Sequence, residues 1–274
     1  MNDLSVILTR FSLYNEKIMS VGWKLGRTKS AEKVLEELMD EERLKIRSEI
    51  FFDYSLPAIN KAYLNGFNIK HIVMHYDKLP GWLLTKIDNA AKMYPWFNAV
   101  AVGFKDEVSF FSEIENCVRA QNFEANKIIP VAGIRLDDDD LIGVKFFEKL
   151  KSYLKPEFCG FCISFPKGII GLWDSGFKKY ANFKEDKCAL GLSQITLFDT
   201  NTNKFISPYL LSPGTHLTVD ERVPTILDST GEPVSLRTLH STNDIMQGVS
   251  NDDISRYINR MLKDEVLFTP QTDL

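Results

Sequence analysis

The sequence lacks any long apolar run. No stretch approaches the roughly 20 apolar residues that cross a bilayer as a helix. The first residues, Met1, Asn2 and Asp3, also lack the basic flank that opens a secretory signal. These absences predict a cytoplasmic protein. Its core is expected to be ordinary, because 44% of the 274 residues are hydrophobic and 26% are charged.

An excess of basic charge is missing too. The formal net charge is -4 and the pI is near 5.7, so we expect no general attraction to nucleic acid and no nucleic-acid partner. Cysteine is scarce, with four residues, of which Cys159 and Cys162 form one CxxC pair. That pair lies within 158–165, a segment with the apolar pattern of a buried strand. We therefore expect neither zinc nor redox chemistry there.

Several catalytic signatures are absent. The sequence has no Rossmann glycine fingerprint, no P-loop, no HExxH helix and no Gly-x-Ser-x-Gly elbow. These absences argue against dehydrogenases, P-loop kinases, zinc proteases and esterases of those kinds.

What the chain does have is a run of four aspartates at residues 137–140, here called the acidic run. It follows an apolar, strand-like segment at 128–136 and precedes a helix that we predict at 141–154. Adjacent carboxylates repel one another, and poor solvation at a strand end raises that cost, so Mg²⁺ or Mn²⁺ is the simplest compensating cofactor. The alternative is helix capping combined with solvated charge.

The order of elements predicts an α/β fold. Apolar runs typical of strands alternate with helical patterns at 30–50 and 57–63; the runs are 4–8, 69–74, 99–104 and 128–136. Crossovers of this kind favour a mixed, mainly parallel sheet flanked by helices, with ligands at the carboxyl ends of its strands. Arg10, Asp77 and the acidic run all fall at such ends.

The second half of the chain has a different pattern of predicted elements, with shorter strands and a long loop. Short strands at 158–165, 169–173 and 193–198 predict a small antiparallel edge, and 207–233 is either connecting coil or a lid over a substrate. Apolar residues at helical spacing predict a C-terminal docking helix at 252–267. We therefore divide the chain into a main domain at 1–245 and a C-terminal helix and tail at 246–274.

Several short blocks together resemble a known family. They are Leu8-Thr9-Arg10-Phe11-Ser12, the segment from Arg47 to Ile59, Tyr76-Asp77-Lys78-Leu79-Pro80, Arg135-Leu136 with the acidic run, and Leu239-His240-Ser241-Thr242-Asn243. In content and order they are similar to the rhamnosyltransferase family of bacterial GT-A-like glycosyltransferases. The resemblance spans roughly residues 4 to 245, and the Arg-Leu-Asp-x-Asp-Asp element is its most specific part.

The resemblance implies a site for a nucleotide-diphosphate sugar. Asp137 and Asp139 would face the donor diphosphate and its metal, with Asp140 supporting them, because residues i and i+2 of an extended segment share a face. Asp138 would point away and be the most replaceable of the four. His240 is the other expected metal ligand, against the alternative of a buried structural histidine.

Further side chains would contact the donor. Arg10 suits the nucleotide or its phosphates because a guanidinium makes bidentate contacts with such oxygens. Arg135 either neutralises the acidic run or reaches a phosphate, Asp77 accepts a hydrogen bond from base or ribose, and Asn243 accompanies His240.

The implied activity is transfer of a sugar from a nucleotide-diphosphate donor to a hydroxyl of a bacterial surface glycan or a lipid-linked saccharide. The family label suggests rhamnose as the sugar. Inverting transfer needs a base, for which Asp220 and Glu221 rank ahead of His216 and Asp174. A lipid-linked acceptor would call for peripheral contact at the inner membrane. Two alternatives stay open: a metal-dependent nucleotidyl transferase or phosphate-ester hydrolase, and a non-enzymatic scaffold.

Overall fold

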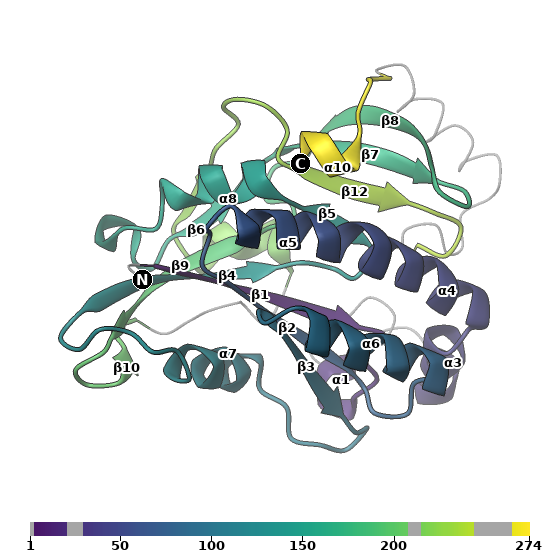
Figure 1. The fold of residues 1–274 in the computed structure, drawn as a ribbon, viewed down its shortest axis with the longest axis horizontal. Helices are drawn as coiled ribbons and strands as arrows, with labels where there is room; N and C mark the ends of the chain where they lie inside the picture. The colour runs from purple at the N-terminus through teal and green to yellow at the C-terminus, as the bar shows by residue number, and fades with distance from the viewer. Residues whose placement is uncertain (1–2, 21–29, 208–214, 244–264) are drawn as a thin grey trace.

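A twisted main sheet runs through the molecule, and four of its neighbouring strands are parallel (Figure 1). The computed structural model describes residues 3–20, 30–207, 215–243 and 265–274. The parallel strands lie in the order β3-β2-β1-β4; their bounds are Phe97–Val102, Ile69–Tyr76, Leu4–Phe11 and Ile128–Arg135. The predicted mixed, mainly parallel α/β fold is therefore confirmed.

The main sheet continues beyond β4 with strands of mixed direction. β9 (Ser193–Asp199) is antiparallel to β4 and to β6 (Cys162–Ser164), and β11 (Thr225–Leu227) is parallel to β6 at the edge. The two-residue β10 (Lys204–Phe205) pairs with β9. β6 and β9 form the small antiparallel edge that the sequence predicts, whereas the strand predicted at 169–173 lies in a second sheet, within Lys167–Trp173.

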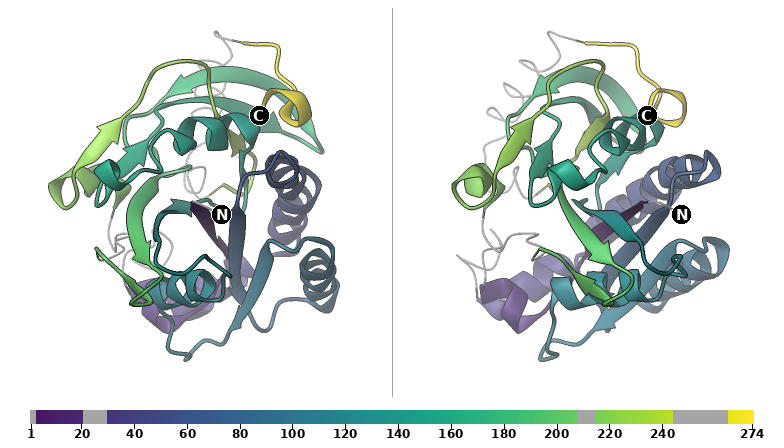
Figure 2. Two further views of the ribbon diagram at one scale, coloured as in Figure 1. Left: turned by 60° about the vertical axis from the view of Figure 1, so that its left-hand side comes forward. Right: turned by 90° about the vertical axis from the view of Figure 1, so that its left-hand side faces the viewer.

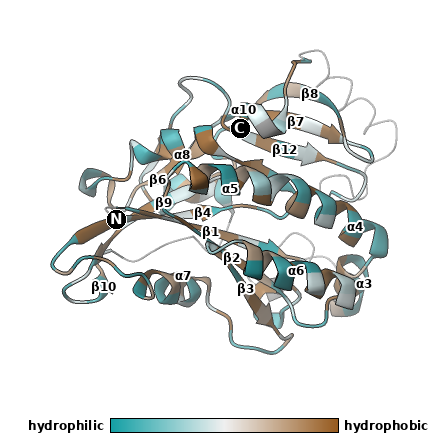
Figure 3. Ribbon diagram, in the orientation of Figure 1, coloured by the Kyte–Doolittle hydropathy of each residue, from teal (hydrophilic) through white to brown (hydrophobic). Residues whose placement is uncertain are grey.

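Helices cover both faces of the main sheet because its strands alternate in the direction of their side chains. On β1, Ile7 and Phe11 pack into one core, whereas Val6 and Leu8 pack into the other. The first face carries α3 (Ala31–Leu38), α4 (Glu41–Ile50), α5 (Leu56–Leu64), α6 (Gly81–Met93) and α8 (Val144–Lys151). The second carries α1 (Glu16–Ser20) and α7 (Phe110–Arg119). Apolar residues follow the strands, and α4 and α6 turn polar residues outward (Figure 3).

A π-helical turn, η1 (Phe51–Ser55), joins α4 directly to α5. At this turn, two neighbouring residues pack into different hydrophobic cores. Phe51 packs under the main sheet, and Ile50 packs against a second sheet. Asp40 caps the start of α4 by accepting a hydrogen bond from the Arg43 backbone N–H (2.8 Å). The long helical run is thereby fixed between the two sheets.

The second sheet has the strand order β5-β12-β7-β8 and lies at one end of the molecule (Figure 2). Its strands are Asp140–Ile142, Ser235–Leu239, Lys167–Trp173 and Phe177–Lys184. Leu141, Trp173 and Leu236 pack there with Ile50 and with Leu274, which follows the short helix α10 (Pro270–Asp273). The acidic run leads from β4 of the main sheet into β5 of this second sheet.

Two predicted elements differ from the structure. The helix predicted at 141–154 was placed too early, because residues up to Ile142 pair with β12 as β5 and Gly143 is extended before α8 begins. The predicted docking helix at 252–267 lies mostly outside the described residues. Its last described part is not helical, since Glu265 forms a β-bridge with Ala181. The 207–233 segment contains η3 (His216–Glu221) and β11.

None of the helices in the described ranges combines the length and the apolar composition that crossing a membrane requires.

Candidate functional site

The acidic run lies at the carboxyl ends of β1 and β4, as the parallel topology predicts. Leu136 follows β4 and its backbone N–H donates to Leu8 of β1 (3.2 Å). A turn follows, closed by a hydrogen bond from the Asp140 N–H to the Asp137 carbonyl (3.2 Å). The four aspartates therefore lie on a short connection between two sheets. Each of their carboxylates has different neighbours.

The buried part of the site is built on Arg47 of α4. Its guanidinium forms ion pairs with Asp138 through Nη1 and with Asp139 Oδ2 through Nη2 (3.0 Å). The side chains of Arg47, Asp138 and Asp139 are only 6%, 4% and 10% exposed. The Ser12 backbone N–H also donates to Asp138 Oδ2 (3.3 Å). The expectation that Asp138 is the most replaceable carboxylate is therefore wrong, because this side chain is buried and ion-paired.

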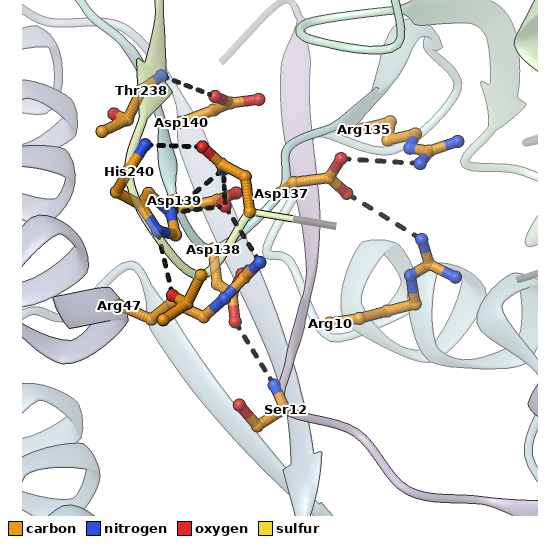
Figure 4. Close-up of polar contacts among 12 residues, drawn as sticks. Arg10, Ser12, Arg47, Arg135, Asp137, Asp138, Asp139, Asp140, Thr238 and His240 are labelled. Atoms are coloured by element: carbon orange, nitrogen blue, oxygen red, sulfur yellow. Dashed lines mark hydrogen bonds and ion pairs between the residues drawn. The ribbon is translucent and has the colours of Figure 1, made fainter. Parts of the chain in front are cut away.

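His240 joins this buried group from the turn after β12 (Figure 4). Asn243 lies three residues further along the chain and joins it too. His240 Nε2 and Asn243 Nδ2 each lie 3.1 Å from Asp139 Oδ2. The His240 backbone N–H donates to Asn243 Oδ1 (2.6 Å), and Thr242 Oγ1 lies 3.0 Å from His240 Nδ1. The two residues therefore lie beside Asp139, and their roles as a metal ligand and a donor-binding residue stay predictions.

The buried carboxylates differ in pKa because they share their arginine unequally. Burial alone would raise the pKa of Asp139, but Arg47 and the hydrogen bond from His240 outweigh it and lower that pKa. For Asp138 burial and the charge of Asp139 outweigh Arg47, so the pKa rises. The pKa of Asp140 lies well above its usual value through burial and the neighbouring Asp139. Of the three buried carboxyl groups, Asp139 is therefore the one whose pKa is lowered.

The open part of the site consists of Arg10, Asp137 and Arg135. Arg10 Nη2 is 3.9 Å from Asp137 Oδ1 and Arg135 Nη2 is 3.5 Å from Asp137 Oδ2. The side chain of Arg10 is 26% exposed, that of Asp137 is 37% exposed and that of Arg135 is 32% exposed. Burial raises the pKa of Asp137, yet Arg135 and Arg10 together bring it below its usual value. Asp137 is therefore an accessible carboxylate between two guanidinium groups.

The predicted metal ligands do not form a ligand set in this arrangement. Mg²⁺ and Mn²⁺ need several oxygen ligands that converge on one point. Asp139 Oδ2 already faces three donors, and Asp140 Oδ1 accepts from the Thr238 N–H (3.2 Å). Over the described ranges, no group of three or more His, Cys, Asp or Glu side chains is placed to hold a metal ion. In this geometry the guanidinium groups of Arg10, Arg47 and Arg135 form ion pairs with the acidic run.

Asp77 and the two predicted bases are exposed. Asp77 follows β2 at the same edge as the acidic run, with its N–H donating to Val102 (3.0 Å). Asp220 and Glu221 end η3, and Asp220 Oδ1 accepts from Lys187 Nζ (2.9 Å). This hydrogen bond lowers the pKa of Asp220. The roles of Asp77 in donor binding and of Asp220 and Glu221 as general bases stay predictions.

Sequence reasoning missed Arg47 as a site residue, although it stands in one of the family-like blocks. A signal was present, since Arg47 and Ser48 lie three and four residues after Leu44 and so share its buried helix face. A charged group on an apolar stripe requires a buried partner. The sequence showed the need for that partner, but only the fold identifies it as the acidic run.

Comparison with known proteins places the chain in a family. Residues 5–251 match the model of the family described as "Putative rhamnosyl transferase". The search of curated proteins finds no match.

Similar solved structures include S. aureus TarS residues 1–349, with 10% identity, coverage of 94% of this chain and 78% of that one, and a TM-score of 0.38. A glucose-1-phosphate thymidylyltransferase-like protein from Bacillus anthracis has 8% identity, 98% coverage of both chains and a TM-score of 0.37. The inositol-1-phosphate CTP transferase from T. maritima has 10% identity, coverage of 96% and 97%, and a TM-score of 0.33. All three TM-scores are too low to support a statement about function.

Proposed function

Because the chain belongs to the family described as "Putative rhamnosyl transferase", we propose that it is a glycosyltransferase that uses a nucleotide-diphosphate sugar. The acceptor is a hydroxyl of a bacterial surface glycan or of a lipid-linked saccharide, and rhamnose is the sugar that the family description suggests.

The observation that carries this proposal is the charged edge where β1 and β4 end. Arg10 and Arg135 come from neighbouring parallel strands and remain partly exposed around Asp137. Ligands of open α/β sheets gather at such carboxyl ends, and guanidinium groups suit the oxygens of a diphosphate. Behind them, the Arg47–Asp139 ion pair and the hydrogen bond between His240 and Asp139 hold the turn in place, and all three side chains are buried.

The reaction replaces the bond between the sugar and the diphosphate with a bond to the acceptor oxygen. The acceptor hydroxyl loses a proton, and the leaving diphosphate keeps the electron pair of the broken bond. Arg10 and Arg135 would stabilise the charge that develops on that diphosphate. Asp220 is the proposed proton acceptor, with Glu221 as the second choice, since both lie within the segment at 207–233 that the sequence marks as a lid or connecting coil.

Product analysis tests this function. The purified protein is incubated with a panel of nucleotide-diphosphate sugars, including a rhamnose donor, and with saccharide acceptors that carry free hydroxyls. We expect a glycosylated acceptor and a stoichiometric amount of nucleoside diphosphate. Pyrophosphate or phosphate release without any sugar transfer would instead indicate a nucleotidyl transferase or hydrolase, and absence of binding to the whole panel would indicate a scaffold.

A further inference from the structure

Asp137 differs from the other three aspartates in its surroundings. Its side chain is 37% exposed, against 4% for Asp138 and 10% for Asp139. Figure 4 shows its carboxylate turned toward Arg10 and Arg135, away from the Arg47 group. Its oxygens lie 3.9 and 3.5 Å from the two guanidinium groups, whereas Asp139 is 3.0 Å from Arg47. Asp137 therefore makes the loosest and most accessible ion pairs of the acidic run.

The two arginines are held side by side by the sheet. Arg135 is the last residue of β4 and is in register with Leu8 of β1, two residues before Arg10. Two guanidinium groups of like charge repel one another, and a carboxylate between them offsets that repulsion. Asp137 thus carries a single negative charge at the place where the pair would receive an oxyanion from solvent.

We propose that Asp137 is the internal counter-ion of an arginine pair that binds the diphosphate of the donor directly, and that it is not a ligand of a divalent cation. This inference rests on the proposed function. A diphosphate brings more charge than one carboxylate and can contact both guanidinium forks at once. Partly exposed ion pairs at these distances contribute little, so the incoming anion displaces Asp137 at small cost.

The rest of the acidic run supports this assignment. A metal on Asp137 would need further oxygen ligands nearby, and the neighbouring carboxylates contact other groups: Asp138 and Asp139 contact Arg47, and Asp140 accepts from Thr238. In this arrangement the positive charge at the site is already supplied by arginine. The two roles of Asp137 predict opposite effects of removing its charge, because a counter-ion competes with the diphosphate and a metal ligand recruits it.

Isothermal titration of inorganic pyrophosphate, UDP, GDP and dTDP tests the proposal, first in EDTA and then in Mn²⁺. We expect at least one nucleoside diphosphate to bind in EDTA. Asp137→Asn should bind about three- to tenfold tighter than the unmodified protein, since it loses a competing charge and a repulsion. Arg135→Met and Arg10→Met should each weaken binding at least about tenfold, as expected for charge-assisted contacts.

Asp88→Asn is the matched control, because it removes one negative charge from an exposed position of α6. Its affinity should equal that of the unmodified protein, and melting curves should show all variants folded. Binding that requires Mn²⁺ and is lost in Asp137→Asn would overturn the proposal and leave the glycosyltransferase function standing. Failure of every diphosphate to bind with and without Mn²⁺ would overturn both.

Discussion

Arg47 and Asp138 are 91 residues apart in the sequence and form an ion pair in which both side chains are almost completely buried. The same guanidinium reaches Asp139, so one arginine of α4 compensates two adjacent carboxylates of the acidic run. Charged groups are costly to bury unless they are paired and hydrogen-bonded. The pair therefore ties the helix on one face of the main sheet to the connection between the two sheets.

Replacing Arg47 with methionine should strongly destabilise the protein. The substitution keeps much of the side-chain volume but leaves Asp138 and Asp139 buried without their guanidinium. Removing one partner of a buried ion pair typically costs about 3–5 kcal/mol. Denaturant unfolding followed by circular dichroism would measure the change in free energy of unfolding.

Lys45→Met provides the matched control on the same helix. Lys45 pairs with Glu41 at 2.7 Å, but the two side chains are 59% and 75% exposed, so little stability should be lost. If Arg47→Met does not fold, the milder Arg47→Lys should still unfold at lower denaturant, because an ammonium group cannot reach both carboxylates in a fork. Equal stability of the Arg47 and Lys45 variants would contradict the prediction.

The sequence predicts much of this fold because its signals are local. Apolar runs locate β1, β2 and β4, and their parallel order places Arg10 and the acidic run at one edge. The family-like block at the other end of the chain brings His240 and Asn243 to Asp139, over a separation of more than 100 residues. The resemblance gave His240 as a metal ligand and Asn243 as a donor-binding residue, but it did not include their contact with Asp139, which no local pattern indicates.

The features that the sequence does not predict depend on contacts between residues far apart in the chain. Residues 140–142 have no strand signal of their own and become β5 because β12 lies beside them. Arg47 shares a helix face with Leu44, but its partners in the acidic run are identified only once α4 is packed between the sheets. The buried surroundings of the acidic run follow from these two events, so its ion pairs with Arg47 could not be predicted from the sequence.

Gly143→Ala should destabilise the junction between β5 and α8. A Cβ at this position would lie 2.8–2.9 Å from the carbonyl carbon, carbonyl oxygen and Cβ of Leu274, whose side chain is buried against Leu141. Overpacking of this kind typically costs about 1–3 kcal/mol. Gly81→Ala in α6 is the control, because its added Cβ meets nothing within 4 Å. Thermal unfolding in which the two variants match would show that Leu274 moves aside freely.

His71 should make stability depend on pH between about 6.5 and 3. Burial lowers its pKa from 6.5 to about 3. Because the folded pKa is below the unfolded one, the unfolded chain binds the extra proton and stability falls as the pH drops below 6.5. By linkage, the loss from this residue alone reaches about 2 kcal/mol at pH 5. The free energy of unfolding of His71→Asn should therefore decrease less than that of the unmodified protein between pH 6.5 and 5.

Thr9→Val is the control for that experiment, since Thr9 Oγ1 lies 2.8 Å from His71 Nε2. This variant loses the hydrogen bond but keeps the titrating ring. It should be less stable at every pH while retaining the slope of the unmodified protein. A slope unchanged in His71→Asn would mean that other groups dominate this window; Asp138 and Asp140, whose pKa values are raised, act in the opposite direction.

Asp220→Asn should lower the turnover number if Asp220 accepts the acceptor's proton. General-base contributions are about 10²–10⁴-fold, and donor affinity should not change, because the group acts on the acceptor hydroxyl.

Lys187 donates to Asp220 and lowers its pKa, so the carboxylate stays ionised as the pH falls. Replacing Lys187 with methionine should therefore shift the acidic limb of the turnover profile to higher pH. Asp88→Asn, which removes a carboxylate from an exposed position of α6, is the matched control, and Glu221→Gln tests the second candidate base. An unchanged turnover number in Asp220→Asn would place the base elsewhere.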